Sequence, residues 1–397
     1  MDPMAATSAD VHEALCGGGA WDVASVLERR REDVLATLRD FASANEDART
    51  SPNLRCESAD EMRGAFALLT DARCAADDDV VLLTCRFLKI CARKAVNRAA
   101  FGEEGINAAL RPLSARCGGG KTTITGADAT RSVIKTRVAA ESASALLNAC
   151  YERENVDALV RRGGVAPLVR ALDPPANVGA ASPELARALQ ALRASAAGAL
   201  QSVCFQRAGR VETLARNGVP ALLRALRDGA SAGPRNDPNL SVRAIGALRN
   251  VTGDAEAIRA VRAFDGGVEL VVDLLEHGDE TVAGSAAGAT QNLSRERASR
   301  ARARERGAVE KLTRLLGGSS DPETQAAAAG ALMNILGPEL DGGRKEGEKK
   351  SGGNGGGGER GGEARKALGK IVSSALALSV VWEALYDAPP DARALMA

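Results

Sequence analysis

A short phrase recurs four times along the chain and ends each time in an asparagine followed by a small or apolar residue. The copies read ASALLNA, GALRNV, GATQNL and GALMNI, and their asparagines are Asn148, Asn250, Asn292 and Asn334. Within each copy the small and apolar residues have helical spacing. Because self-similarity at a period of roughly 40 residues is typical of stacked helical repeats, the phrase predicts an elongated array. A residue repeated on a repeated helix builds a surface rather than a catalytic centre.

The composition of the 397 residues supports an all-helical array. Only 3% of the residues are aromatic, and alternating strand-like segments are absent from the sequence. The 52 basic and 51 acidic residues leave a formal net charge of +1. This balance indicates no general attraction to nucleic acid or to an acidic membrane surface.

The cysteines and histidines do not form a pattern expected of a metal or catalytic site. The chain has eight cysteines without a CxxC pair, and its histidines are His12 and His277. We expect Cys85, Cys150 and Cys204 to be buried thiols on apolar helix faces, in a reducing compartment. The sequence therefore predicts no catalytic residues, no metal and no cofactor.

The two ends of the sequence carry no targeting or membrane-spanning signal. The first 15 residues contain acidic side chains and lack an apolar core, unlike a secretory or transit peptide. The most apolar late segment, residues 371–382, is too short to cross a bilayer. We expect a cytoplasmic or nuclear protein without integral membrane insertion.

The two clearest copies of the repeat each predict three consecutive helices. These are residues 255–263, 268–275 and 281–293 in one copy, and 296–305, 309–316 and 323–336 in the next. Asp321-Pro322 is a favourable start for the last of them, with proline at the first helical position. Earlier copies contain longer connections before the third helix, in Gly/Pro/Ser/Thr-rich insertions at 114–130, 173–183 and 228–239. We expect these insertions on one edge of the array.

Glycines occur at two fixed places in the repeat. Gly105, Gly164, Gly218 and Gly307 precede second helices, where we expect a left-handed residue that allows a sharp reversal. A second set lies mid-helix, four residues before the asparagine position: Gly198, Gly246, Gly288 and Gly330. Because a mid-helix glycine costs about 1 kcal/mol, its recurrence predicts close approach of a neighbouring helix.

The order of short helix, glycine, LVxLL-type helix, turn and AAxALxNL helix resembles the armadillo repeat. The resemblance covers residues 77–336 as about five repeats plus a leading third helix at 78–92, and it implies a right-handed α-solenoid of three-helix repeats. We expect an N-terminal helical cap at 1–76, a Gly-rich disordered linker at 337–363, and a C-terminal capping helix and tail at 364–397.

The armadillo resemblance implies a role for the asparagines. In that family the third helices line a concave groove in which an asparagine binds the backbone of an extended partner. By position this role falls on Asn148, Asn250, Asn292 and Asn334, and we expect the partner along the last three of these. Lys89 and Ser202 replace asparagine in two units. The alternative is that the asparagines cap or cross-link helices within the solenoid.

The importin-α branch of the family adds a tryptophan four residues before the groove asparagine, which forms pockets for lysines. The equivalent positions in this sequence are Cys85, Ser144, Gly198, Gly246, Gly288 and Gly330. Both tryptophans, Trp21 and Trp382, lie outside the repeats. We therefore do not expect this chain to bind nuclear-localisation signals in that manner.

Two further segments offer binding chemistry. Residues 295–306 carry a run of arginines that is either a solvated helix face or a docking patch for an acidic partner: Arg295, Arg297, Arg300, Arg302, Arg304 and Arg306. No aromatic residues are interleaved, which argues against nucleic acid. The GGGKTT segment at 118–123 lacks the first glycine and the preceding strand of a phosphate-binding loop.

The function we predict is a non-catalytic scaffold or adaptor that binds a protein, as an extended peptide or a folded partner, along the groove of third helices. The alternative is a nuclear transport or membrane-tethering adaptor with a divergent groove. The sequence leaves the partner, the pathway and the oligomeric state open.

Overall fold

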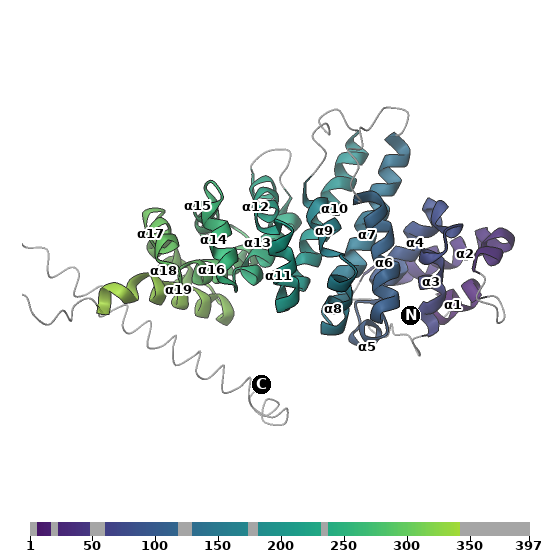
Figure 1. Ribbon diagram of the computed structural model, residues 1–397, viewed down its shortest axis with the longest axis horizontal. Coiled ribbons are helices and arrows are strands. Elements are labelled where there is room, and N and C mark those ends of the chain that lie inside the picture. The colour runs from purple at the N-terminus through teal and green to yellow at the C-terminus, as the bar shows by residue number, and fades with distance from the viewer. Residues whose placement is uncertain are drawn as a thin grey trace, which may run out of the picture. The chain divides into compact units, whose positions relative to one another are not determined.

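The fold was analysed in a computed structural model that describes residues 6–16, 23–47, 60–117, 129–173, 182–231 and 237–341 (Figure 1). In these ranges every regular element is a helix and no strand occurs. The chain divides after Ala257 into two compact units. The Gly-rich segment beyond 341, the C-terminal segment 364–397 and the GGGKTT segment lie outside the described residues.

The first unit begins with three N-terminal helices and continues with helices of the repeat. Its N-terminal elements are α1 (Ser8–Cys16), α2 (Val23–Asn45), α3 (Asp60–Thr70) and the 3-10 helix η1 (Cys74–Ala76). The repeat helices are α4 (Asp78–Cys91), α5 (Ala95–Ala99), α6 (Gly102–Cys117), α7 (Ala129–Ala149), α8 (Arg153–Arg161), α9 (Val165–Leu172), α10 (Pro183–Phe205), α11 (Arg207–Ala215), α12 (Gly218–Gly229) and α13 (Pro238–Val251).

Helix α14 (Ala255–Ala263) includes the division, and the second unit continues the same order. Its further elements are α15 (Gly267–Asp273), the 3-10 helix η4 (Leu274–Glu276), α16 (Glu280–Leu293), α17 (Arg297–Glu305), α18 (Ala308–Gly318) and α19 (Pro322–Asp341). The predicted three-helix order is therefore present. Helix α19 continues to Asp341, so the first five residues of the predicted linker at 337–363 are helical in the structure.

The third helices of the first unit pack side by side. Contacts join α4 to α7, α7 to α10, and α10 to α13. Helices α4, α10 and α13 each begin at a capping side chain that accepts a backbone N–H, namely Asp77, Ser182 and Asp237. In the second unit α16 packs on α19 in the same way, and Asp279 and Asp321 cap them. These caps set where each third helix starts and so which residues share its exposed face.

Alanine and leucine fill the space between the helices. Leu146, Leu200 and Leu248 are fully buried at equivalent places on α7, α10 and α13. Cys85, Cys150 and Cys204 are buried as predicted, and their thiols are free. Burial raises the pKa of the Cys150 and Cys204 thiols to about 12, so both stay protonated near neutral pH.

The N-terminal helices continue the apolar core at the start of the first unit. Phe41 of α2 packs edge-on against Phe87 of α4 with ring centroids 4.8 Å apart. Phe66 of α3 lies 5.5 Å from Phe101, which precedes α6. These contacts join α2 and α3 to the first repeat helices, and the N-terminal cap at 1–76 stays a prediction.

The glycines before the second helices serve two different purposes. Gly307 has a φ of 77°, as predicted for a left-handed reversal, and Gly266 has a φ of 66°. In the third repeat unit the left-handed residue is instead Asn217, one position before Gly218. A Cβ on Gly218 would collide with Thr213, so this glycine is required by packing rather than by its backbone angle. The prediction for Gly105, Gly164 and Gly218 was wrong, because the left-handed residues are Gly102, Gly163 and Asn217 instead.

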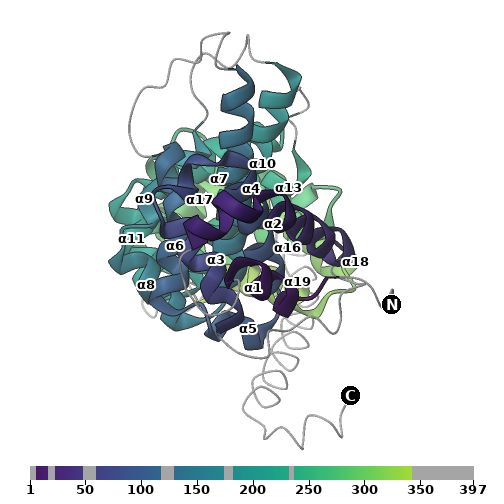
Figure 2. The same ribbon diagram turned by 90° about the vertical axis from the view of Figure 1, so that its right-hand side faces the viewer.

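The insertions before the third helices partly lengthen those helices. Helices α7 and α10 have 21 and 23 residues, whereas α13 and α16 each have 14. The additional turns are at the N-terminal ends of α7 and α10, which extend beyond α4 and α13 in two perpendicular views (Figures 1 and 2). Residues 114–117 of the first insertion are likewise helical, as the end of α6.

Candidate functional site

The asparagine positions lie in the C-terminal halves of the third helices. In the first unit the column consists of Lys89 on α4, Asn148 on α7, Ser202 on α10 and Asn250 on α13. In the second unit Asn292 on α16 and Asn334 on α19 occupy the same place. All four asparagines are half-buried.

Asn148, Asn250 and Asn334 each connect two neighbouring third helices. Asn148 Nδ2 donates to the backbone carbonyl of Lys89 at 2.9 Å, and Asn250 Nδ2 donates to the carbonyl of Gln201 at 2.9 Å. In the second unit Asn334 Nδ2 donates to the carbonyl of Gln291 at 3.0 Å. These hydrogen bonds are cross-links between helices of the solenoid, which were the alternative to a groove role for the asparagines.

The cross-links do not use up the hydrogen-bonding capacity of the asparagines. A side-chain amide has two N–H donors and a carbonyl oxygen that accepts two bonds. Among the described residues, Asn148, Asn250 and Asn334 each use one N–H for the neighbouring helix. A second N–H and the Oδ1 oxygen remain, which are the groups that an extended peptide backbone requires. The groove role stays a prediction, and it is chemically compatible with the cross-link.

The first interruption of the column is closed by ion pairs. Lys89 Nζ lies 2.8 Å from a carboxylate oxygen of Glu141 on α7 and 3.8 Å from one of Glu46. Arg86 Nε lies 3.4 Å from both carboxylates. Because these charges neutralise each other, this end of the third-helix surface has little free charge to offer a partner. The second interruption, Ser202, is buried.

The mid-helix glycines make room for side chains of neighbouring third helices. A Cβ on Gly246 would lie 2.5 Å from Nε2 of Gln201, and one on Gly330 would collide with Gln291. At Gly198 the side chains of Leu147 and Arg243 occupy the space. The predicted close approach is therefore made by long side chains. These side chains fill space beside the glycines, where the importin-α branch would have a tryptophan.

Arg243 is a further cation of this surface. It lies on α13 two helical turns before Asn250, and its Nη1 and Cδ would be 2.5 and 2.8 Å from a Cβ on Gly198. The side chain is half-buried, and desolvation lowers its pKa. Within the described residues it makes no hydrogen bond or ion pair.

Two large aromatic side chains are exposed three residues after the column. Tyr151 follows α7 and is 63% exposed, while Phe205 ends α10 and is 74% exposed. The Arg98 guanidinium carbon lies 5.3 Å from the centre of the Tyr151 ring. Neither aromatic residue was predicted as part of the site. Alignment of the repeats on the asparagine column could have found them, because it places an aromatic residue at the same position of two consecutive repeats. Both lie earlier in the chain than the repeats where we expected the partner.

The arginine run at 295–306 is largely engaged in contacts within the second unit. Arg306 forms two hydrogen bonds with the carboxylate of Asp273, at 2.8 and 2.6 Å. Arg302 donates to the carbonyl of Arg262 at 3.0 Å, and Arg304 donates to the carbonyl of Ile335. Arg295 and Arg300 donate to the backbone carbonyls of Asn292 and Ser294 at the end of α16, whereas Arg297 is exposed. The docking patch stays a prediction, but these contacts favour a structural use of most of the run.

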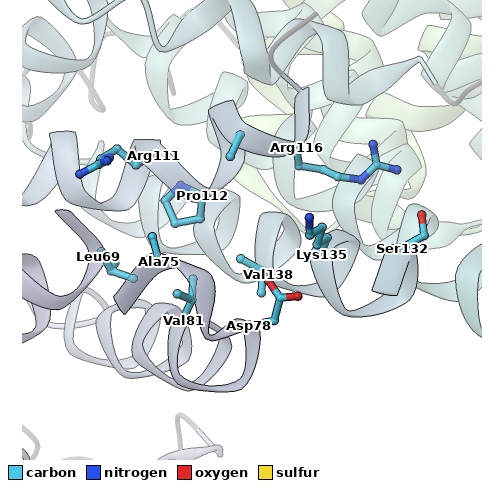
Figure 3. A pocket seen from close by; sticks show the side chains of 11 residues that line it. Leu69, Ala75, Asp78, Val81, Arg111, Pro112, Arg116, Ser132, Lys135 and Val138 are labelled. Atoms are coloured by element: carbon cyan, nitrogen blue, oxygen red, sulfur yellow. The ribbon is translucent and has the colours of Figure 1, made fainter. Parts of the chain in front are cut away.

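A cavity of about 350 Å³ lies among α3, α4, α6 and α7 of the first unit (Figure 3). Apolar side chains such as Leu69, Val81 and Val138 line it together with the polar side chains of Asp78, Arg111, Arg116 and Lys135. Arg111 donates to the carbonyl of Thr70, and Arg116 donates to the Thr136 hydroxyl at 3.2 Å. The polar groups of the cavity are thus of mixed charge, and two of them already have partners.

In the described ranges of the chain, no group of three or more metal-ligating side chains occurs. None of the described helices is long and apolar enough to cross a membrane.

Comparison with known proteins shows the kind of fold to which the chain belongs. No protein-family model matches it. Cellulose Synthase Interactive 2 of Arabidopsis thaliana is 31% identical over 112 residues, which are 28% of this chain and 5% of that protein. The chain thus matches only a small part of that relative.

The similarity to solved structures extends over most of the chain. One engineered protein has a TM-score of 0.53 at 26% identity, covering 70% of this chain and 97% of its own. Another has a TM-score of 0.58 at 24% identity, covering 83% and 71%. A designed armadillo repeat protein has a TM-score of 0.52 at 19% identity, covering 68% and 98%. The chain therefore has an armadillo-like fold, an all-helical solenoid, as the sequence predicted.

Proposed function

We propose that the chain is a non-catalytic protein-binding scaffold that holds an extended segment of a partner against α7, α10 and α13. The observation that carries this proposal is the hydrogen bonding of Asn148 and Asn250. Each uses one N–H to join two repeats and keeps a second N–H and a carbonyl oxygen on a half-exposed surface. An extended backbone presents the complementary C=O and N–H groups in every residue, whatever its side chains.

Asparagines alone bind too weakly to explain a stable complex. A hydrogen bond contributes roughly 0.5–1.5 kcal/mol, whereas a micromolar dissociation constant requires about 8 kcal/mol. Burying apolar area supplies about 25 cal/mol per Å², so large exposed side chains next to the column are effective anchors. Tyr151 and Phe205 provide such area beside α7 and α10. We assign them to the binding surface as apolar contacts.

The fold and the named relative agree with protein binding at this general level. The Arabidopsis relative is described by its name as interacting with cellulose synthase, but the chain matches only 5% of it. We therefore transfer no partner. A transport or tethering adaptor remains the alternative function, and cytoplasmic or nuclear localisation remains a proposal.

The test uses the full chain and a display library of random unstructured peptides. Peptides that bind are synthesised, and their affinity is compared for the parent protein, Asn250→Ala and Asn155→Ala. Asn155 is a matched control because its Nδ2 also joins two repeats, donating to the carbonyl of Arg98 at 2.8 Å, but it lies on the first helix α8. Each variant is first checked for helix content.

The proposal predicts that Asn250→Ala weakens peptide binding by about fivefold to tenfold, as expected for one hydrogen bond. Asn155→Ala should lower stability without changing affinity. Equal affinities for Asn250→Ala and the parent protein would mean that the asparagine is only a cross-link. If no library peptide binds the parent protein, the scaffold proposal fails.

A further inference from the structure

The most informative unassigned group on the third-helix surface is Arg243. Its guanidinium reaches from α13 over Gly198 of α10, where a Cβ would come within 2.5 Å of Nη1. Leu147 of α7 approaches the same glycine from the other side. The cation therefore lies over the middle helix of three neighbouring third helices. Glycine at 198 is what allows it to lie there.

The equivalent position on α7 carries the opposite charge. Glu141 is seven residues before Asn148, as Arg243 is seven residues before Asn250. Glu141 is neutralised by Lys89 Nζ at 2.8 Å, with Arg86 Nε at 3.4 Å. Arg243 has no such partner among the described residues. On α4 and α7 the charged side chains are thus paired with each other. On α13, no described anion pairs with Arg243.

A half-buried arginine without a partner is costly, because burial removes water that a charged group needs. The depressed pKa of Arg243 reflects this desolvation. An approaching carboxylate would regain that energy through two parallel N–H···O bonds, which a planar guanidinium forms readily. Tyr151 raises the pKa of Arg243 by less than desolvation lowers it, so it does not replace an anion.

We propose that Arg243 is a specificity-determining residue, which selects partners whose extended segment places an aspartate or glutamate beside Gly198. This inference rests on the proposed scaffold function and names the chemistry of its partner. The acidic side chain would pair with Arg243 while the backbone on either side meets Asn148 and Asn250. Apolar side chains of the same segment would contact Tyr151 and Phe205. The occupant is thus an acidic peptide segment with apolar flanking residues.

The test repeats the peptide selection with the full chain and two charge-reversed variants. Arg243→Glu changes the proposed contact. Arg161→Glu makes the same change on the first helix α8. Arg161 is exposed there, and its Nη2 lies 3.5 Å from Glu103 Oε2. A selected peptide is then synthesised with glutamate, glutamine or phosphoserine at its acidic position. Arg243→Met, which keeps most of the aliphatic stem, serves if Arg243→Glu does not fold.

We expect the parent protein and Arg161→Glu to enrich one acidic position, and Arg243→Glu to replace it with lysine or arginine. The glutamate peptide should bind the parent protein at least about 10-fold more tightly than the glutamine peptide, as expected for a hydrogen bond between charged groups. Arg243→Met should bind the two equally. Unchanged acidic enrichment with Arg243→Glu or Arg243→Met overturns the inference but leaves the scaffold function intact. Tighter binding of phosphoserine than glutamate overturns the carboxylate assignment, and absence of any binding peptide overturns both proposals.

Discussion

The amide of Asn250 and the backbone carbonyl of Gln201 form a 2.9 Å hydrogen bond between two third helices. The side chain of the same Gln201 lies over Gly246, on the helix that carries Asn250. The second unit repeats this arrangement with Asn334, Gln291 and Gly330. Asparagine and the glycine four residues before it are therefore two parts of one contact between repeats. This explains why the two residue types recur together in the sequence.

The first prediction concerns the contribution of this contact to stability. Asn250→Ala removes one inter-repeat hydrogen bond and should lower the free energy of unfolding by about 1 kcal/mol. Urea unfolding followed by circular dichroism measures the change. Hydrogen exchange should also become faster in α13. An unfolding curve that coincides with that of the parent protein would mean that the bond adds no stability.

The second prediction compares two helical glycines with different neighbours. At Gly246 a new Cβ meets the end of the flexible Gln201 side chain, which can move, and alanine gains about 1 kcal/mol of helix propensity. At Gly209 a new Cβ meets the backbone carbonyl of Val203, which cannot move aside. Gly209→Ala should therefore lower the free energy of unfolding by about 1–3 kcal/mol. Gly246→Ala should lower it by clearly less. Thermal unfolding of both variants decides this, and a larger loss for Gly246→Ala would contradict it.

The third prediction concerns acid stability at the start of α4. The Arg31 guanidinium, with Nε 2.6 Å from Asp77, holds the pKa of that carboxyl below its ordinary value. Because the folded pKa is depressed, the stability that Asp77 contributes is present above the ordinary pKa. It is lost as the pH falls through the folded value.

Asp77→Asn should accordingly reduce stability near neutral pH, and the difference from the parent protein should shrink below about pH 5. Urea midpoints measured across this range test the sign. Arg31→Met should flatten the same pH dependence. A difference that is constant with pH would exclude Asp77 as the titrating group.

The fourth prediction concerns the exposed aromatic residues. Tyr151→Ser and Phe205→Ser should each weaken binding of a selected peptide about tenfold, as for a moderate interface anchor. Their stability should change little, because the side chains are 63% and 74% exposed in the free protein. Val211→Ser on the first helix α11 is the control, since Val211 is also exposed, at 54%. Equal losses in all three variants would indicate a general surface effect.

Much of the fold could be predicted because the repeat shows its helices in the spacing of apolar residues. The third helix at residues 281–293 was predicted within one residue, and Asp321-Pro322 correctly marked the next. The left-handed position at Asn217 was missed because packing, rather than backbone angle, determines Gly218. The local sequence does not show which of two adjacent residues, here Asn217 and Gly218, adopts the left-handed conformation that reverses the chain.

The candidate site was predictable only in part. The asparagine column follows from the repeat, but the carbonyl that each amide reaches depends on the distance between helices some 50 residues apart in the chain. The unpaired state of Arg243 could not be predicted, because it depends on every charge brought near it by folding. Lys89, which looked like an interruption, proved to complete an ion-pair network with Glu141.

The most direct test of the central claim, that a partner lies along the third helices, is site-specific photocrosslinking of a bound peptide. A benzophenone amino acid replaces Phe205 at the end of α10 in one protein and Arg224 on the second helix α12 in another. Both positions are exposed. The account predicts that the peptide is captured from position 205 and not from position 224. Capture from position 224 alone would contradict it.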